Sequence, residues 1–258
     1  MVLRKDEEFD RTDLNIQRAN ERGMIHRDYI AHCFRWTYIQ NWLSRRDSEF
    51  AGEKSRKNHR YQHAHVLDIG CGKDLMLYRV LNSNKLLPLS YTGVDINELA
   101  IPTGFEGSRL KPNLIQQDFC SIASLPTAPN LITCFEMLEH VPIDYARRTL
   151  NKAYELSSDG SYLILSTPVY YERYGMANNH INEMTRPLLV DMLMDCKWKI
   201  KENYGTFCGQ YEIRNALTEE EKKIYDELRN YYSTHVLSTI FAPMYPEYSR
   251  NNLWVCTK

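Results

Sequence analysis

Several features that would place this chain of 258 residues in a special class are missing from it. Its seven cysteines are odd in number and form no Cys-x-x-Cys pair, so neither a disulfide framework nor a structural zinc site is indicated. No apolar stretch approaches the roughly 18 residues of a membrane span. The first residues, Met1 to Glu8, lack the apolar core of a signal peptide. We therefore expect a cytoplasmic protein in a reducing compartment, without a membrane partner.

An excess of charge of either sign is also missing. The 32 Lys and Arg residues against 33 Asp and Glu give a formal net charge of −1, which exerts no global attraction on nucleic acid. A local basic run covers residues 45–60, and a nucleic-acid partner would bind there. Because acidic residues dilute the run, a solvated linker is the simpler interpretation. The content of 43% apolar and 25% charged residues suits one large globular domain with appendages, and no feature specifies an oligomeric state.

The most informative segment is His65–Lys73, in which an apolar strand runs into a glycine turn. Asp68 stands at the carboxyl end of this strand. Gly70 and Gly72 let the backbone turn sharply and approach a ligand with no Cβ in the way. Since ligands of open parallel sheets bind outside the carboxyl ends of the strands, this turn predicts a nucleotide site.

Acidic residues recur at the next three strand ends. Asp95 ends a strand at 91–95 and stands 23 positions beyond Gly72, a spacing typical of a carboxylate that binds ribose hydroxyls. Asp118 and Phe119 follow a strand at 113–117 and suit the amino group and the ring face of adenine. The strand at 130–135 is followed by three ionisable residues, Glu136, Glu139 and His140. Four consecutive strand ends with acids are hard to explain by packing alone.

Strands and helices alternate from Val66 onward, which predicts an α/β fold with a doubly wound, mostly parallel, seven-stranded sheet. The other expected helices cover 74–84, 144–157 and 186–195, and the other strands 162–166, 198–204 and 252–257. We divide the chain into an N-terminal helical extension with a basic linker, 1–62, and a main domain, 63–258. Within that domain, 210–248 forms a helical insertion on the substrate side before the last strand.

Two helices outside this alternation carry clear signals. Residues 26–43 form an amphipathic pattern with an apolar stripe of Tyr29, Cys33, Trp36, Ile39 and Leu43. This stripe must be buried, either on the flank of the sheet or as a lid over a ligand. Thr218 and Glu221 form a capping box that opens a helix in the insertion.

In combination these motifs resemble the class I S-adenosylmethionine-dependent methyltransferases, over roughly Val66 to Lys258. The resemblance implies a Rossmann-like methyltransferase fold with S-adenosylmethionine as cofactor. The expected cofactor residues share positions at or beside the strand ends: Asp68, Gly70, Gly72, Asp95, Ile96, Asp118, Phe119 and Glu136. The family usually has a third glycine where this chain has Asp74, which we interpret as a cap of the following helix.

A second group of ionisable residues lies beyond the fourth and fifth strands. Glu136, Glu139, His140 and His180 offer two carboxylates and two imidazoles, a set that suits Mg²⁺, Mn²⁺ or Fe²⁺ better than a structural zinc. Without a metal, His140 or His180 is the natural proton acceptor. We therefore name His140, His180 and Glu136 as candidate catalytic residues.

The same residues narrow the resemblance to two branches of the family. Glu136–Pro142 is similar to a segment of the ubiquinone-pathway O-methyltransferases. The segment that begins at His180 partly resembles the small-RNA terminal 2′-O-methyltransferases. Both resemblances imply a metal site, whereas metal-free relatives also carry Glu-His here, where the histidine acts as a base or packs. The sequence thus predicts methylation, more at oxygen than at nitrogen, of a small-molecule or nucleotide-like acceptor.

Other functions remain as alternatives. A regulatory subunit that binds the cofactor without turnover is one, and a methyltransferase of RNA or modified DNA nucleotides is another. Typical DNA-base methylation is disfavoured because the chain has no Pro-Cys pair. A nicotinamide dehydrogenase would need glycine at the position of Leu75.

Overall fold

Seven strands form a single sheet in the part of the chain that the computed structural model describes, residues 27–50, 64–83 and 87–258. Their spatial order is β3-β2-β1-β4-β5-β7-β6, and only β7 runs against its neighbours. The strands are β1 (His65–Ile69), β2 (Ser90–Asp95), β3 (Pro112–Gln116), β4 (Leu131–Phe135), β5 (Tyr162–Pro168), β6 (Lys199–Cys208) and β7 (Ser249–Thr257). The predicted doubly wound, mostly parallel sheet is confirmed.

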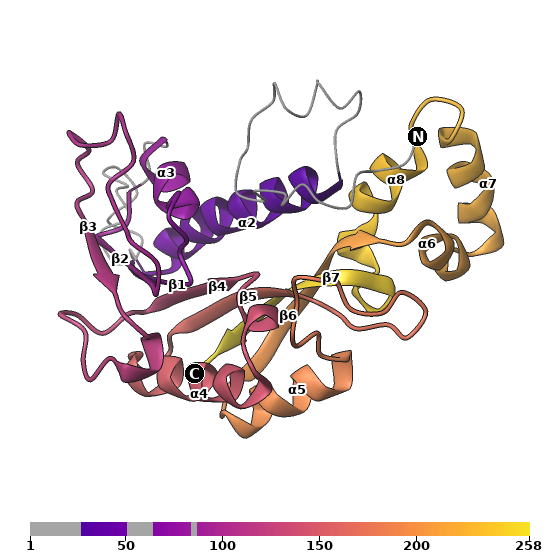
Figure 1. Ribbon diagram of the computed structural model, residues 1–258. Helices are drawn as coiled ribbons and strands as arrows, with labels where there is room; N and C mark the ends of the chain where they lie inside the picture. The colour runs from indigo at the N-terminus through magenta and orange to yellow at the C-terminus, as the bar shows by residue number, and fades with distance from the viewer. Residues whose placement is uncertain (1–26, 51–63, 84–86) are drawn as a thin grey trace.

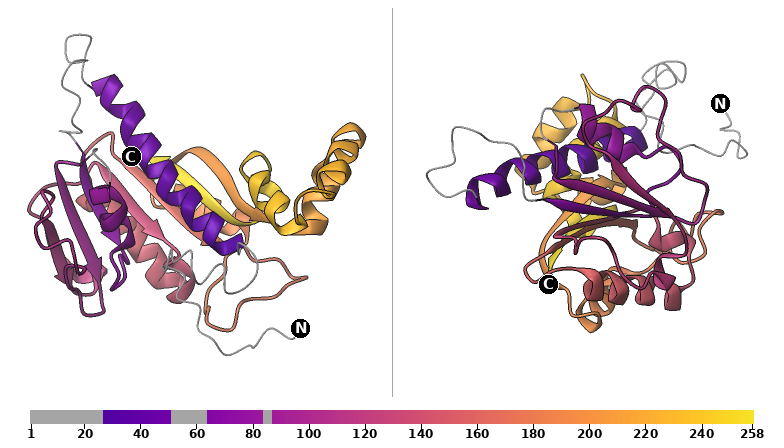
Figure 2. Two further views of the ribbon diagram at one scale, coloured as in Figure 1. Left: turned by 90° about the horizontal axis from the view of Figure 1, so that it is seen from above. Right: turned by 90° about the vertical axis from the view of Figure 1, so that its left-hand side faces the viewer.

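Helices cover both faces of this sheet (Figure 1, Figure 2). Helices α2 (Arg27–Phe50) and α3 (Met76–Ser83) pack on one face, and α4 (Ile143–Leu156) and α5 (Arg186–Asp195) pack on the other. The central strands are therefore buried on both sides, which explains their nearly continuous apolar sequences.

Helix α2 packs on the flank of the sheet. Trp36, Ile39 and Leu43 are buried in one core cluster with residues of β1, β4, β5 and β7. These three residues belong to the predicted stripe, and each fully buried side chain of this size contributes about 1.5–3 kcal/mol. The helix continues to Phe50, past the expected end at Leu43. Arg35 is buried on the same helix, at 2% exposure.

The predicted insertion contains three helices between β6 and β7. They are α6 (Gln210–Ala216), α7 (Glu219–Leu228) and α8 (Thr234–Ile240), followed by the short turns η4 (Ala242–Met244) and η5 (Pro246–Tyr248). They have a small apolar core of their own. The capping box is confirmed, because Thr218 Oγ1 accepts the Glu221 amide at 3.3 Å and Glu221 Oε2 accepts the Thr218 amide at 2.8 Å.

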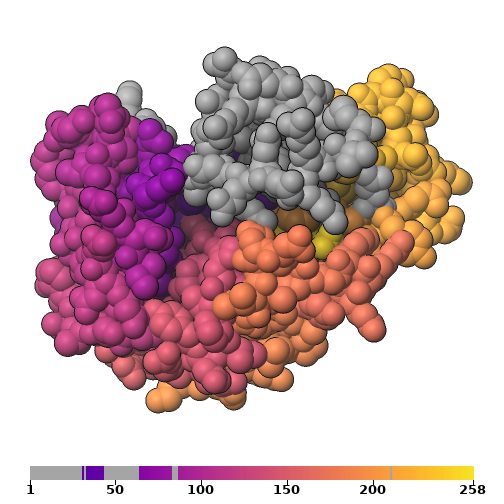
Figure 3. Space-filling view, viewed as in Figure 1, coloured from indigo at the N-terminus to yellow at the C-terminus, as the bar shows by residue number. Residues whose placement is uncertain are grey.

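The strand register places the carboxyl ends of β1 to β5 at one edge of the sheet. Ile69 is opposite both Val94 and Cys134, Asp95 is opposite Gln116, and Phe135 is opposite Ser166. The residues that follow these strands therefore meet at the same edge. In Figure 3 this view of the molecule is hollowed between the magenta side, with β2 and β3, and the salmon and orange residues that follow β4.

The last three strands are also longer than the sequence predicted. Strand β5 ends at Pro168 instead of 166, β6 ends at Cys208 instead of 204, and β7 begins at Ser249 instead of Asn252. Long antiparallel pairing extends all three, since β7 pairs with both neighbours almost to its start. Among the described residues, no helix is long and apolar enough to cross a membrane. The side chains of the basic run at 45–60 lie outside the described part, so the nucleic-acid prediction stays untested there.

Candidate cofactor and acceptor site

The glycine turn after β1 has the conformation that its glycines allow. Gly70 and Gly72 have φ values of 68° and 67°, in the left-handed region that favours glycine. A Cβ on Gly70 would lie 2.7 Å from Met137 Cγ, whereas a Cβ on Gly72 would meet no atom of the described residues within 4 Å. Leu75 also has a positive φ, 47°, before α3 begins at Met76. The turn therefore contacts the segment after β4 on one side and open space on the other.

Asp68 is a buried carboxylate at the end of β1. Tyr91 Oη and Thr133 Oγ1 donate hydrogen bonds to its two oxygens, each at 2.7 Å. Burial outweighs these hydrogen bonds and raises the pKa of Asp68 to about 6. Its side chain therefore carries a negative charge above neutral pH, directly before the turn.

Asp95 joins the end of β2 to the glycine turn. Its Oδ2 accepts the Gly72 amide at 2.9 Å, and its Oδ1 accepts the amide and the side chain of Asn97. Ile96 beside it is 74% exposed. The structure thus brings Asp68, Asp95 and both glycines to one place, as the sequence predicted.

Asp118 and Phe119 lie after β3, where they contact the turn η2 (Phe119–Ser121), helix α4 and the core of the sheet. Asp118 caps η2 and accepts hydrogen bonds from Cys120, Ser121 and Tyr145. The hydrogen bond from Tyr145 is the main cause of a lowered Asp118 pKa. Phe119 is buried in the core cluster of the sheet. Their expected contacts to adenine stay a prediction.

Glu136, the first residue after β4, is held by a buried polar network. Arg35 Nη2 lies 3.0 Å from its Oε1, and Ser166 Oγ donates to the same oxygen at 2.7 Å. Asn251 Nδ2 donates to Oε2 at 2.8 Å. Arg35 also donates to Asn251 Oδ1, which Thr206 Oγ1 contacts at 2.9 Å. Helix α2 and strands β5, β6 and β7 together fix this carboxylate.

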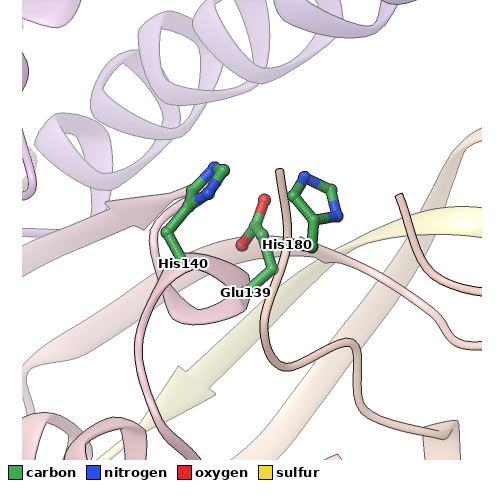
Figure 4. A group of neighbouring side chains, drawn as sticks. All are labelled: Glu139, His140 and His180. Atoms are coloured by element: carbon green, nitrogen blue, oxygen red, sulfur yellow. The ribbon is translucent and has the colours of Figure 1, made fainter. Parts of the chain in front are cut away.

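Glu139, His140 and His180 come together beside it. Each offers one ligand atom, and these atoms lie within 4.8 Å of one another. Figure 4 shows the Glu139 carboxylate between the two imidazole rings. Glu139 and His140 belong to the turn η3 (Leu138–His140), and His180 comes from the loop after β5. Glu139 O accepts the amides of Ile181 and Asn182, which ties the loop to η3.

The two histidines are oriented by neighbours on their Nδ1 atoms. His140 Nδ1 lies 3.0 Å from the carbonyl oxygen of Asn179, which can only accept a hydrogen bond. His180 Nδ1 pairs with Glu183 Oε1 in a buried pair. Burial works to raise the pKa of Glu183, but the hydrogen bonds from His180 and the Ala177 amide outweigh it and lower that pKa. In a neutral ring with Nδ1 as donor, Nε2 carries the lone pair that binds a cation or a proton.

Glu139 is fully buried and incompletely satisfied. Thr167 Oγ1 donates to its Oε2 at 3.1 Å, while its Oε1 has no hydrogen-bond partner among the described residues. Burial, and after it the charge of Glu136, raise the pKa of Glu139 well above its usual range. A cation at this position would satisfy the buried oxygen. Glu136 is not part of this cluster within the described residues.

Sequence reasoning missed the partners that hold these groups. Arg35 stands beside the apolar stripe of α2, but its burial, which requires an acidic partner, is evident only from the fold. Glu183 follows His180 by three positions, the spacing of a local pair. No sequence pattern indicated Asn251 and Thr206, because the pairing of β6 with β7 is what brings them to the site.

Comparison with known proteins identifies the family of this chain. The family described as "Methyltransferase domain" matches residues 36–217, more than half of the chain. A ubiquinone biosynthesis O-methyltransferase of Coxiella burnetii is 32% identical over 106 residues, which cover 40% of this chain and 43% of that protein. The chain thus spans less than half the length of this curated relative.

Solved structures share the fold at low sequence identity. A SAM-dependent methyltransferase from Archaeoglobus fulgidus matches 86% of this chain and 94% of its own, with 17% identity and a TM-score of 0.51. The cyclase SpnF matches 76% of this chain and 74% of its own, with 15% identity and the same TM-score. The cyclase illustrates that the fold alone does not specify a reaction. From the family match and the geometry of the glycine turn, the chain belongs to the methyltransferase-domain family, among the class I S-adenosylmethionine-dependent methyltransferases.

Proposed function

We propose that this protein transfers the methyl group of S-adenosylmethionine to an oxygen of a small-molecule or nucleotide-like acceptor, assisted by a divalent cation. The supporting observation is the contact between the two halves of the site. Gly70 of the cofactor turn packs against Met137, and Met137 stands between Glu136 and the cluster of Glu139 and His140. A methyl donor at the turn and an acceptor at the cluster would therefore be neighbours.

The residues of the turn fit this cofactor. Gly72 faces open space that a side chain would enter. The ionised form of Asp68 attracts the positively charged methionine part of the cofactor, and Asp95 offers carboxylate oxygens to ribose hydroxyls. Because a sulfonium is already a strong electrophile, the protein mainly has to position the acceptor oxygen close to the methyl group.

The cluster of Glu139, His140 and His180 fits a divalent cation such as Mg²⁺, Mn²⁺ or Fe²⁺. The unpartnered Glu139 Oε1 and the orienting contacts on both Nδ1 atoms support this assignment. When bound, such an ion would hold an acceptor hydroxyl and lower its pKa. His140 is exposed, so the cluster opens to solvent on its side. If no cation binds, the same imidazoles can accept the proton of the acceptor.

The choice of oxygen as acceptor atom rests on the names of the curated relatives and on the chemistry of the donor set. The curated relatives are named as ubiquinone biosynthesis O-methyltransferases, and they match only part of this chain. The carboxylate and imidazole donors also suit an ion that binds neighbouring hydroxyls.

Isothermal titration with S-adenosylmethionine tests the cofactor assignment. We expect binding tighter than about 1 mM, and we expect Asp95→Ala to weaken it. If the wild type fails to bind in this range and Asp95→Ala binds equally well, the assignment is wrong.

Incubation with methyl-labelled cofactor, followed by mass spectrometry of separate metabolite, RNA and DNA fractions, tests turnover and acceptor class. Label in an oxygen of a small metabolite or nucleotide supports the proposal. Label in polymeric RNA or DNA favours the nucleic-acid alternative, and tight cofactor binding with no labelled product favours a regulatory subunit. Chelator and Glu139→Gln should abolish labelling while cofactor binding survives, and labelling that persists in chelator leaves the imidazoles as the acid-base groups.

A further inference from the structure

Glu136 differs from the other acids of the site because its charge is already matched. The Arg35 guanidinium, 2% exposed, contacts it from helix α2 at 3.0 Å. Ser166 on β5 and Asn251 on β7 donate to the two carboxylate oxygens as well. Three elements that are far apart in sequence thus supply donors to one carboxylate.

The backbone at Glu136 also departs from the usual conformation. Its φ is 51°, in the left-handed region, which costs a residue other than glycine about 1–2 kcal/mol in general. Its amide donates to Ser166 O at 2.9 Å, so the residue is fixed at both backbone and side chain. Strain of this kind persists where surrounding contacts maintain it. The network around Arg35 provides such contacts.

We propose that Arg35 is a positioning residue that binds Glu136 on the α2 side of the site, so that the cation is held by Glu139, His140 and His180 without Glu136. This inference rests on the cation in the proposed function. It assigns to α2 a part in the site in addition to covering the sheet. It also revises the sequence prediction that Glu136 is a fourth metal ligand.

Charge balance leads to the same arrangement. The arginine and Glu136 together contribute no net charge, which leaves Glu139 as the carboxylate available to the cation. If Arg35 loses its charge, Glu136 loses its ion pair and becomes a second carboxylate close to the cluster. Because the number of charged ligands sets the affinity for divalent cations, binding should then become tighter.

Titration with Mn²⁺, followed by the electron paramagnetic resonance signal of the free ion, tests this arrangement without an acceptor or turnover. We expect R35Q/E136Q, which removes the ion pair as a unit, to bind Mn²⁺ within about twofold of the wild type, whereas Glu139→Gln loses about tenfold or more. Arg35→Gln should bind about tenfold more tightly, and the double variant R35Q/E136Q should return to the wild-type affinity. Arg214→Gln, which removes an exposed ion pair to Asp226 on the insertion, is the matched control and should change nothing.

The measured affinities decide whether Glu136 is a ligand of the cation. A loss in R35Q/E136Q as large as that in Glu139→Gln would make Glu136 a ligand and overturn the proposal, as would an Arg35→Gln affinity equal to that of the wild type. If Arg35→Gln does not fold, the double variant still decides, since it leaves no buried charge unpaired. Absence of Mn²⁺ binding in the wild type also overturns the inference. Cofactor titration of the same samples then reports separately on the methyltransferase assignment.

Discussion

At the scale of single residues, the carboxylates of the site differ in what surrounds them, and their chemistry differs accordingly. Asp68 lies buried between two hydroxyl donors, Asp95 is tied to backbone amides, and Glu136 is paired with an arginine. The sequence predicted which acids stand at the strand ends, because the residue types are local. It did not predict their environments, because the partner of Glu136 on β7 is 115 positions away.

Replacement of Asp68 by asparagine should change how stability depends on pH. The pKa of Asp68 is about 6 in the folded protein against 3.8 for an exposed aspartate, so the folded state holds the proton between these two pH values. Relative to Asp68→Asn, the free energy of unfolding of the wild type should therefore fall by about 2 kcal/mol as the pH rises from 4 to 7. Urea unfolding of both proteins across this range measures the difference. A difference independent of pH would contradict the assigned burial.

Substitution of the two glycines of the turn by alanine should have different effects on stability and on cofactor affinity. In Gly72→Ala the new Cβ has room, so we expect a stability loss of only about 1–2 kcal/mol from the positive φ. Cofactor affinity should fall about tenfold or more, because the methyl group enters the space assigned to the ligand. Gly70→Ala is the comparison, since contact with Met137 adds about 1–3 kcal/mol of overpacking. Titration calorimetry and urea unfolding measure both effects, and unchanged affinity in Gly72→Ala would place the cofactor elsewhere.

At the scale of elements, periodicity predicted most helices and strands, and pairing partners set their ends. The helix expected at 186–195 is α5 to the residue, while β6 and β7 are longer than their local patterns indicate. Helix α2 is the informative case. Its apolar stripe predicted burial, but only the fold reveals that the same helix delivers Arg35 to the site.

Truncation of Trp36 tests the docking of α2. Its ring is 8% exposed and contacts Phe135 edge to face at a centroid distance of 5.4 Å. We expect Trp36→Ala to cost about 3–5 kcal/mol of stability. Thr218→Ala, which removes the cap of α7, serves as a reference and should cost about 1 kcal/mol. Equal losses in urea unfolding would mean that α2 contributes little to the core.

At the scale of the whole molecule, the edge formed by β1 to β5 gathers the candidate cofactor and acceptor residues, while two core clusters on opposite faces hold that edge in place. The position of this edge followed from the alternation of strands and helices. The identity of the acceptor could not be predicted in this way, because methyl transfer requires few specific groups and one fold supports several reactions.

Cofactor binding should stabilise the whole domain. At a ligand concentration of about 100 times Kd, the gain is about 2.7 kcal/mol, which raises Tm by roughly 5–10 °C for a domain of this size. Asp95→Ala should lose most of this shift at the same concentration. Differential scanning fluorimetry with and without S-adenosylmethionine measures it, and equal shifts in both proteins would remove Asp95 from the cofactor site.

The position of β7 between β5 and β6 has a consequence for synthesis. Strand β6 is made earlier, yet it joins the sheet only through β7, and Asn251 on β7 completes the network around Glu136. A ribosome must therefore release residues 249–257 before the edge with β6 can assemble. Until then the nascent chain exposes an open strand edge on β5, and such an edge can pair with other chains.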